Sequence, residues 1–120
     1  MFGLPNQTLD DFRSDLEQAI TYKPEHISCY QLTLDPQSPL FAKWSKEVKE
    51  DVAVEMYSLR NKMLSEAGYT GYEISNFAQD SQSQSKHNTD FWLGKDYLGF
   101  GLGAVGQVGK KIRSNASTWE

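Results

Sequence analysis

The sequence predicts an α/β protein built from parallel βαβ units. Segments with apolar residues at helical spacing alternate with segments of strand-like composition, and proline or glycine residues stand between them. Strands that alternate with helices in this way usually form parallel sheets with right-handed crossovers. The chain has 120 residues, whereas a closed eight-unit barrel takes about 250. We therefore expect the later part of a larger catalytic domain.

Composition excludes several classes of protein. The net charge is −4, from 16 acidic and 12 basic residues without a basic stripe, so a nucleic-acid partner is not expected. Apolar runs are only a few residues long, which predicts no membrane insertion and a cytoplasmic protein. Cys29 is the single cysteine. It excludes an internal disulfide and any metal site that needs two thiolates from this chain, and we expect it to be buried.

The first predicted elements are a strand end and a helix. Gly3 and Pro5 cannot continue a central strand, so residues 1–7 have the pattern of a strand that is ending. Thr8 can cap the helix that follows, with Asp11 three residues later, and Pro24 stops it. The apolar face of this helix is expected to consist of Leu9, Phe12, Leu16, Ala19 and Ile20.

A strand is predicted over residues 26–34. Ile27, Cys29, Gln31 and Thr33 alternate with Tyr30, Leu32 and Leu34, so the two sets lie on opposite faces. We expect the face of Tyr30, Leu32 and Leu34 to lie under a helix. The other face becomes polar towards the carboxyl end, where ligands bind in parallel α/β folds. Strand periodicity alone does not separate a binding pocket from a fraying strand end.

The middle of the chain predicts a loop, a second helix and a third strand. Two prolines place residues 35–40 in a loop. A helix is expected from about Ser45 to Ala67, ended by Gly68, with a buried stripe made of Val48, Val52, Met56, Leu59 and Met63. Residues 69–77 are predicted to be one strand, and residues 78–86, with a single apolar residue, a mobile surface loop.

A glycine-rich segment near the end of the chain allows two interpretations. Residues 101–106 match the dinucleotide-binding pattern G-x-G-x-x-G, but no helix-like pattern follows them. Alternatively, Gly99, Gly101 and Gly103 lie on one face of an extended chain and leave room for a backbone or a flat ligand. Phe100 and Leu102 would then pack on the opposite face, and this second interpretation is favoured.

His87 also has two readings. A histidine that follows a polar loop is commonly structural, for instance when it is hydrogen-bonded to a neighbour such as Asn88. A functional histidine there would serve as a base, a metal ligand or an axial haem ligand. Phe91 and Trp92 are most simply anchors that fasten the loop to the domain.

Several separated segments resemble one family. "FGLPNQT", "HISCYQLTLDPQSPL", "GYEISNFA", "HNTDFW" and "YLGFGLGA" occur in the order and spacing found in HemW-like proteins. These proteins are relatives of the oxygen-independent coproporphyrinogen III oxidase within the radical SAM superfamily. "YEISNFA" followed by "HNTDFW" is specific to the HemW-like branch. The resemblance covers nearly the entire chain.

The resemblance implies the second half of a partial (β/α)6 TIM-like radical SAM barrel. In such proteins a 4Fe-4S cluster, held by a C-x-x-x-C-x-x-C motif, binds and reductively cleaves S-adenosylmethionine. This chain has neither that motif nor the family's glycine-rich segment for the methionine part of the cofactor. Residues 1–78 would form the barrel part, and residues 79–120 a loop and a glycine-rich extension leading towards a further C-terminal domain.

The resemblance also implies candidate site residues. Met1 and Thr33 match strand-end positions that line the adenosine pocket in the oxidase, and Gln31 is a weaker candidate on the same face. His87 matches the histidine of the signature H-N-x-x-(Y/F)-W, which is associated with haem binding in HemW-like proteins. Phe91 stands where tyrosine is more usual, so a hydroxyl is missing while the aromatic ring remains.

Two functions follow from the resemblance. The first is a protein that binds haem or a porphyrin and hands haem to haem-requiring acceptor proteins. The alternative is a coproporphyrinogen III dehydrogenase of haem biosynthesis. A third hypothesis is that the 120 residues alone only fold and are inactive, with no cofactor tightly bound. Half a barrel exposes strand edges, so self-association or swapping of elements is also expected.

Overall fold

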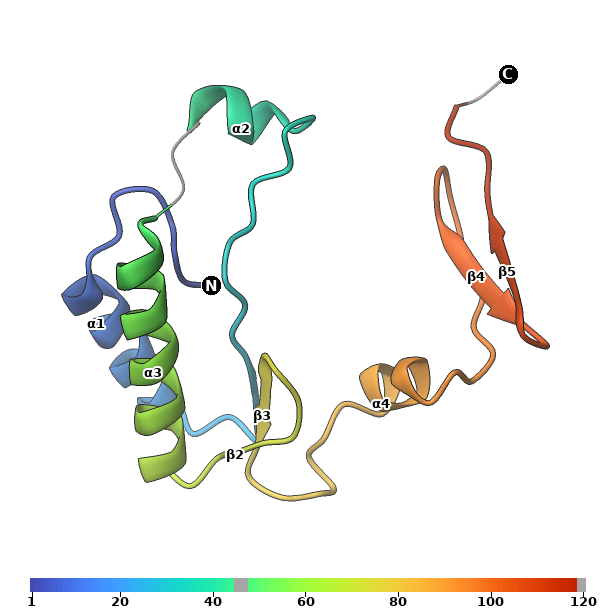
Figure 1. The fold of residues 1–120 in the computed structure, drawn as a ribbon. Helices are drawn as coiled ribbons and strands as arrows, with labels where there is room; N and C mark the ends of the chain where they lie inside the picture. Colours follow the sequence, from blue (N-terminus) through green and yellow to red (C-terminus); the bar gives the residue numbers. More distant parts are fainter. Residues whose placement is uncertain (45–47, 119–120) are drawn as a thin grey trace. The chain divides into compact units, whose positions relative to one another are not determined.

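The computed structural model describes residues 1–44 and 48–118, which form two compact units, Met1–Gln84 and Ser85–Glu120. In the first unit the elements run in the order α1 (Leu9–Thr21), β1 (His26–Ser28), α2 (Pro39–Lys43), α3 (Glu50–Glu66), β2 (Thr70–Gly71) and β3 (Asn76–Ala78) (Figure 1). The three strands form one sheet in the order β1-β3-β2, and α1 packs against α3.

The first helix forms as the sequence predicts. The Thr8 hydroxyl accepts a hydrogen bond from the backbone N–H of Asp11, and the Asp11 carboxylate accepts one from the backbone N–H of Thr8. This reciprocal capping box satisfies two backbone donors that the helix itself leaves free. Phe12 and Leu16 on the predicted face are buried, which places α1 against the core.

The start of the chain and the second predicted strand lie side by side in parallel. The Phe2 N–H donates to the Tyr30 carbonyl at 3.0 Å, and the Leu32 N–H donates to the Phe2 carbonyl at 2.8 Å. Phe2 and Gln31 are thus paired in a parallel bridge on either side of α1. The first βαβ unit that the sequence predicts is confirmed in its direction, although regular strand geometry is limited to His26–Ser28.

The predicted third strand is wrong in both extent and direction. Residues 69–77 form two short strands joined by a turn, and β3 pairs antiparallel with both β1 and β2. The Ser75 N–H donates to the Glu73 carboxylate at 2.6 Å, and the Tyr72 N–H donates to the Asn76 carbonyl at 3.1 Å. These local bonds reverse the chain, and a reversed chain can pair with β1 only in the antiparallel sense.

The second helix also differs from the prediction. α3 begins at Glu50, and the predicted start at Ser45 lies outside the described residues. Of the predicted stripe, Met56 is buried, and Val52, Leu59 and Met63 are partly buried and pack against the core. The helix also buries Ala53, Arg60 and Leu64, which were not in the predicted stripe. The predicted loop of residues 35–40 runs into the short helix α2, which the Ser38 hydroxyl caps by accepting from the Phe41 N–H at 3.2 Å.

The core of the first unit lies between the sheet and the two long helices. It contains Phe2, Phe12, Leu16, Cys29, Met56, Leu64, Tyr69 and Phe77. The Phe2 and Phe12 rings stack with centroids 5.2 Å apart. Burial of these aromatic and aliphatic side chains is the main driving force for the unit.

The second unit consists of α4 (Lys86–Trp92) and a hairpin of β4 (Val105–Val108) and β5 (Lys111–Ser114) (Figure 1). Gly109 and Lys110 form its turn with φ of 55° and 66°, the left-handed values that two-residue hairpins require. None of the described residues 85–118 is buried. Across both units, no helix of the described chain is both long and apolar enough to cross a membrane.

Candidate functional site

The three residues proposed for the adenosine pocket lie on the two segments joined by the parallel bridge between Phe2 and Gln31. Met1 precedes the Phe2–Gln31 bridge, and Thr33 follows it. The Met1 side chain is 62% exposed, and Gln31 and Thr33 are also exposed. Gln31 lies over Gly3 and, with Val48 and Tyr57, lines a pocket of about 450 Å³ at the start of α3. The bridge places the segments that carry Met1, Gln31 and Thr33 side by side, with Met1 before it and Thr33 after it.

The face assignment of the 26–34 segment is reversed at Cys29 and Tyr30, but it holds at the end of the segment, where Leu34 is buried and Gln31 and Thr33 are exposed. Cys29 lies in the core with Phe2 and Met56, and Ile27 packs against that core. Tyr30 is 45% exposed. The Cys29 face therefore lies under the helices, as its small apolar thiol allows. Its predicted burial is confirmed, and this burial raises the pKa of the Cys29 thiol above its ordinary value.

A polar network that the sequence did not predict occupies the other face of the sheet. Ser28 and Asn76 are paired residues of β1 and β3, and the Ser28 hydroxyl donates to the Asn76 side-chain oxygen. The Asn76 amide nitrogen donates to the Tyr30 hydroxyl at 3.1 Å. His26 and Tyr72 form a second contact, with Nε2 and the hydroxyl 2.8 Å apart. The alternation of polar residues at positions 26, 28 and 30 could have predicted this network. Instead, the covering helix was expected on the face of these residues.

The burial of Arg60 is a second feature that helical periodicity did not predict. It is 1% exposed, although it is an arginine in the middle of α3. Its Nη1 donates to the Cys29 carbonyl at 2.8 Å and its Nη2 to the Ile74 carbonyl at 2.9 Å. The guanidinium also lies 4.3 Å from the centre of the Tyr57 ring. Within the described residues no carboxylate contacts it, so this buried cation is held by neutral acceptors and aromatic rings.

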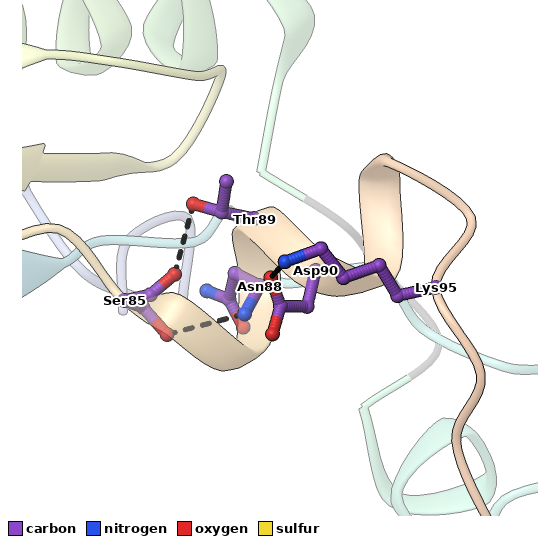
Figure 2. Close-up of polar contacts among 5 residues, drawn as sticks. All are labelled: Ser85, Asn88, Thr89, Asp90 and Lys95. Atoms are coloured by element: carbon purple, nitrogen blue, oxygen red, sulfur yellow. Dashed lines mark hydrogen bonds and ion pairs between the residues drawn. The ribbon is translucent and has the colours of Figure 1, made fainter.

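His87 lies in the first turn of α4, in the second unit, and is exposed. The Ser85 hydroxyl caps this helix by accepting from the Asn88 N–H at 3.3 Å, and the Thr89 hydroxyl donates to the Ser85 carbonyl at 3.0 Å (Figure 2). Within the described chain the His87 ring makes no hydrogen bond, so the structural reading through Asn88 does not apply. The imidazole is presented on a capped helix with its nitrogens available.

Aromatic side chains accompany His87. Phe91 follows it by one helical turn and is therefore on the same side of α4. The Phe91 ring packs on the Tyr97 ring with centroids 5.1 Å apart and is still half exposed, as is Trp92. The end of α4 is further held by an ion pair between Lys95 and Asp90 (Figure 2). An available imidazole beside exposed aromatic rings suits axial ligation and packing of a flat apolar macrocycle.

The glycine segment is not extended as predicted. Gly101 and Gly103 have φ of 92° and 66°, and they form a turn before β4. Phe100 is 83% exposed, so the expected packing of its ring is absent in the described residues. A strand rather than a helix follows the glycines, which removes the structural context of a dinucleotide site.

The residues present do not fit an iron–sulfur cluster. Such clusters need several cysteine thiolates, and this chain has one thiol, buried beneath α1 and α3. Among the described residues there is also no group of three or more histidine, cysteine or acidic side chains that could hold a metal ion. By contrast, haem needs only an accessible axial ligand and apolar contacts, and His87 with its aromatic neighbours fits that need.

Comparison with known proteins gives several similar sequences. The heme chaperone HemW of Buchnera aphidicola subsp. Acyrthosiphon pisum is 40% identical over 111 residues, which are 92% of this chain and 29% of that protein. HemW of Escherichia coli is 39% identical over 109 residues, 90% of this chain and 28% of that protein. The mitochondrial radical S-adenosyl methionine domain-containing protein 1 of Danio rerio is 36% identical and is covered over 25% of its length. No protein-family model matches the chain.

One solved structure shares the fold. The coproporphyrinogen III oxidase HemN of Escherichia coli, described as a radical SAM enzyme, superposes with a TM-score of 0.75 at 18% sequence identity. The match covers 98% of this chain and 30% of that one. This chain therefore has the α/β fold of part of that structure. The sequence matches confirm the resemblance to HemW proteins, over a segment that spans under a third of their length.

Proposed function

We propose that this chain is the part of a HemW-like protein that contributes to haem binding and trafficking. The observation that carries the proposal is His87, an exposed imidazole without a hydrogen bond in the described chain, one turn from the exposed ring of Phe91. Sequence identity of about 40% to proteins named heme chaperone supports haem as the ligand. Haem would then be passed to haem-requiring acceptor proteins.

His87 would serve as an axial ligand of the haem iron, and the rings of Phe91 and Trp92 would contact the porphyrin. Ligation requires a neutral imidazole nitrogen with a free lone pair. The cap formed by Ser85 orders the first turn of α4, so the imidazole starts from a fixed backbone. Haem would be the cargo and would supply the iron centre. The residues of this chain would hold and orient it.

The strand ends of the first unit would contribute to a cofactor site in the intact parent. We propose a partial (β/α)6 barrel there, in which Met1, Gln31 and Thr33 line the adenosine pocket for S-adenosylmethionine. The parallel bridge between Phe2 and Gln31 supports this arrangement, because it pairs the two segments that carry these residues in the parallel sense. The cluster ligands would come from outside this chain, since Cys29 is its single thiol.

A haemin titration followed by the Soret absorbance tests the haem site. The chain contains only two histidines. Saturable binding should be lost, or its ligand-field spectrum changed, in His87→Ala but retained in His26→Asn. His26 is the matched control because its ring already contacts the Tyr72 hydroxyl. Equal binding by His87→Ala and the unchanged chain, or no binding by either, would reject His87 as the ligand in this chain.

The oxidase function remains a second candidate because the shared fold is that of a coproporphyrinogen III oxidase. It would oxidatively decarboxylate propionate side chains of coproporphyrinogen III to vinyl groups: a radical derived from S-adenosylmethionine would take one hydrogen atom from each propionate, which would then release CO2 and pass one electron to an external electron acceptor. The intact parent decides between the two. Formation of protoporphyrinogen under anaerobic, reducing conditions, without transfer of haem, would favour the oxidase and reject the chaperone.

We also propose that the isolated chain self-associates. Phe91, Trp92, Leu98, Phe100 and Ile112 of the second unit are all at least 48% exposed, and that unit buries none of its described residues. Large exposed apolar side chains favour association. Light scattering over a range of concentrations should show a mass above 13.6 kDa. A monomeric mass at high concentration would contradict this.

A further inference from the structure

A small pocket in the second unit has the properties of a carboxylate site. The segment of residues 97–99 lies along β4 and, with the hairpin, encloses a cavity of about 130 Å³. Leu98 and Val108 supply apolar walls, and the backbone of Gly99 and Gly106 forms the floor. The guanidinium-bearing side chain of Arg113 lines the same cavity. The cavity therefore combines apolar walls with one cation.

Backbone contacts hold the walls of this pocket. Tyr97 and Gln107 exchange two backbone hydrogen bonds of 2.8 Å each. A side chain at Gly99 would overlap the backbone of Val105, so the two segments approach as closely as glycine allows. The Asn115 amide donates to the carbonyls of Gly99 and Gly101, at 3.1 and 2.8 Å. These bonds hold the cavity together without any ligand.

The charge of Arg113 is not compensated within the described unit. It faces Gly106 across the hairpin, where no side chain can pair with it, and it makes no hydrogen bond or ion pair with described residues. The two acidic residues of the range 85–118 are otherwise engaged: Asp90 pairs with Lys95, and Asp96 accepts from the Gly109 N–H at 2.9 Å. The only group at the pocket with a full charge is therefore a cation with all its donors available.

We propose that this pocket binds the carboxylate of a largely apolar ligand through Arg113. A guanidinium matches a carboxylate with two parallel hydrogen bonds, and the apolar walls would contact the carbon atoms that carry it. The ligand class rests on the proposed function, because a porphyrin is an apolar body that carries propionate carboxylates. The geometry of the pocket favours a carboxylate, and the haem proposal names one molecule that carries it.

The test compares haemin with its dimethyl ester, in which both propionates are methylated and uncharged. Arg113→Gln should weaken haemin binding about tenfold, as expected for loss of a hydrogen bond between charged groups. The same substitution should leave binding of the ester unchanged. Lys111→Gln is the matched control, because it removes a positive charge two residues away on β5 without lining the pocket. Equal effects of the two substitutions, or equal loss for haemin and ester, would overturn the proposal.

A second probe separates this site from the haem proposal. Benzoate, a small aromatic carboxylate, is titrated into the isotope-labelled chain while the amide signals of Gly99 and Gly106 and the Nε–H signal of Arg113 are followed by NMR. Saturable shifts that vanish in Arg113→Gln support the pocket even if haemin does not bind, in which case only the haem proposal fails. Haemin binding that is insensitive to Arg113→Gln, without benzoate shifts, overturns the pocket and leaves the haem proposal standing.

Discussion

Replacement of Arg60 by methionine should destabilise the first unit by about 2–4 kcal/mol. Methionine keeps most of the apolar volume of the side chain but removes the guanidinium. The buried carbonyl of Cys29 and the carbonyl of Ile74 both lose their side-chain donor. The Cys29 carbonyl directly follows β1 and the Ile74 carbonyl lies in the β2–β3 turn, so the substitution removes the side-chain link between these two segments and α3.

The magnitude follows from the environment of each acceptor. Cys29 is 4% exposed, so its carbonyl cannot regain a bond from water, and loss of the donor costs about 1–3 kcal/mol. Ile74 is 74% exposed, so water can partly replace the donor, and the cost there is about 0.5–1.5 kcal/mol. Loss of the contact with the Tyr57 ring adds about 0.5–1 kcal/mol. These losses add up to about 2–5.5 kcal/mol. Removal of a buried cation acts in the opposite direction and lowers the net destabilisation to about 2–4 kcal/mol.

Urea unfolding followed by far-UV circular dichroism measures this change as a shift in midpoint at constant slope. Lys62→Met is the matched control: it changes an exposed basic residue of the same helix and should alter the free energy of unfolding by less than about 0.5 kcal/mol. If Arg60→Met were as stable as the unchanged chain, or more stable, the cost of burying the guanidinium would exceed the value of its hydrogen bonds, and the reasoning would be refuted.

Two further predictions concern ionisable groups. Hydrogen bonds from the Thr8 hydroxyl and backbone lower the pKa of Asp11, so its contribution to stability is fully present above the ordinary aspartate pKa of about 3.9 and is lost as the pH falls through the lowered value. Asp11→Asn should therefore lower the melting temperature at pH 6 and flatten its decline below pH 4; a pH profile identical to that of the unchanged chain would contradict the cap. Because burial raises the pKa of the Cys29 thiol, it should react with a thiol reagent at pH 8 roughly a hundredfold more slowly in the folded chain than in urea. Equal rates would show that the thiol is accessible.

Local signals in the sequence determined the parts of the structure that depend on neighbouring residues. The Thr8 and Asp11 cap and the apolar face of α1 follow from spacing within one or two turns. Burial of Cys29 follows from its chemistry, and the parallel relation of Phe2 and Gln31 follows from the intervening helix. In the second unit, His87 was identified by likeness to a signature; the helix that carries it was not predicted, because the polar residues before it resemble a loop.

Only the tertiary structure decided which face of each element is buried. Alternation in the 26–34 segment separates two faces but does not say which one meets α1 and α3, and the choice made from hydrophobicity was reversed at Cys29 and Tyr30. The antiparallel β3 depends on a turn stabilised by Glu73 and by Arg60 from a different element. An arginine has the sequence properties of a surface residue, and its burial becomes favourable only where separate segments supply carbonyls and rings around it. Likewise, the alternating glycines predicted room for another backbone at Gly99, but only the structure shows that this backbone is that of Val105 in β4 and that a pocket beside Arg113 results.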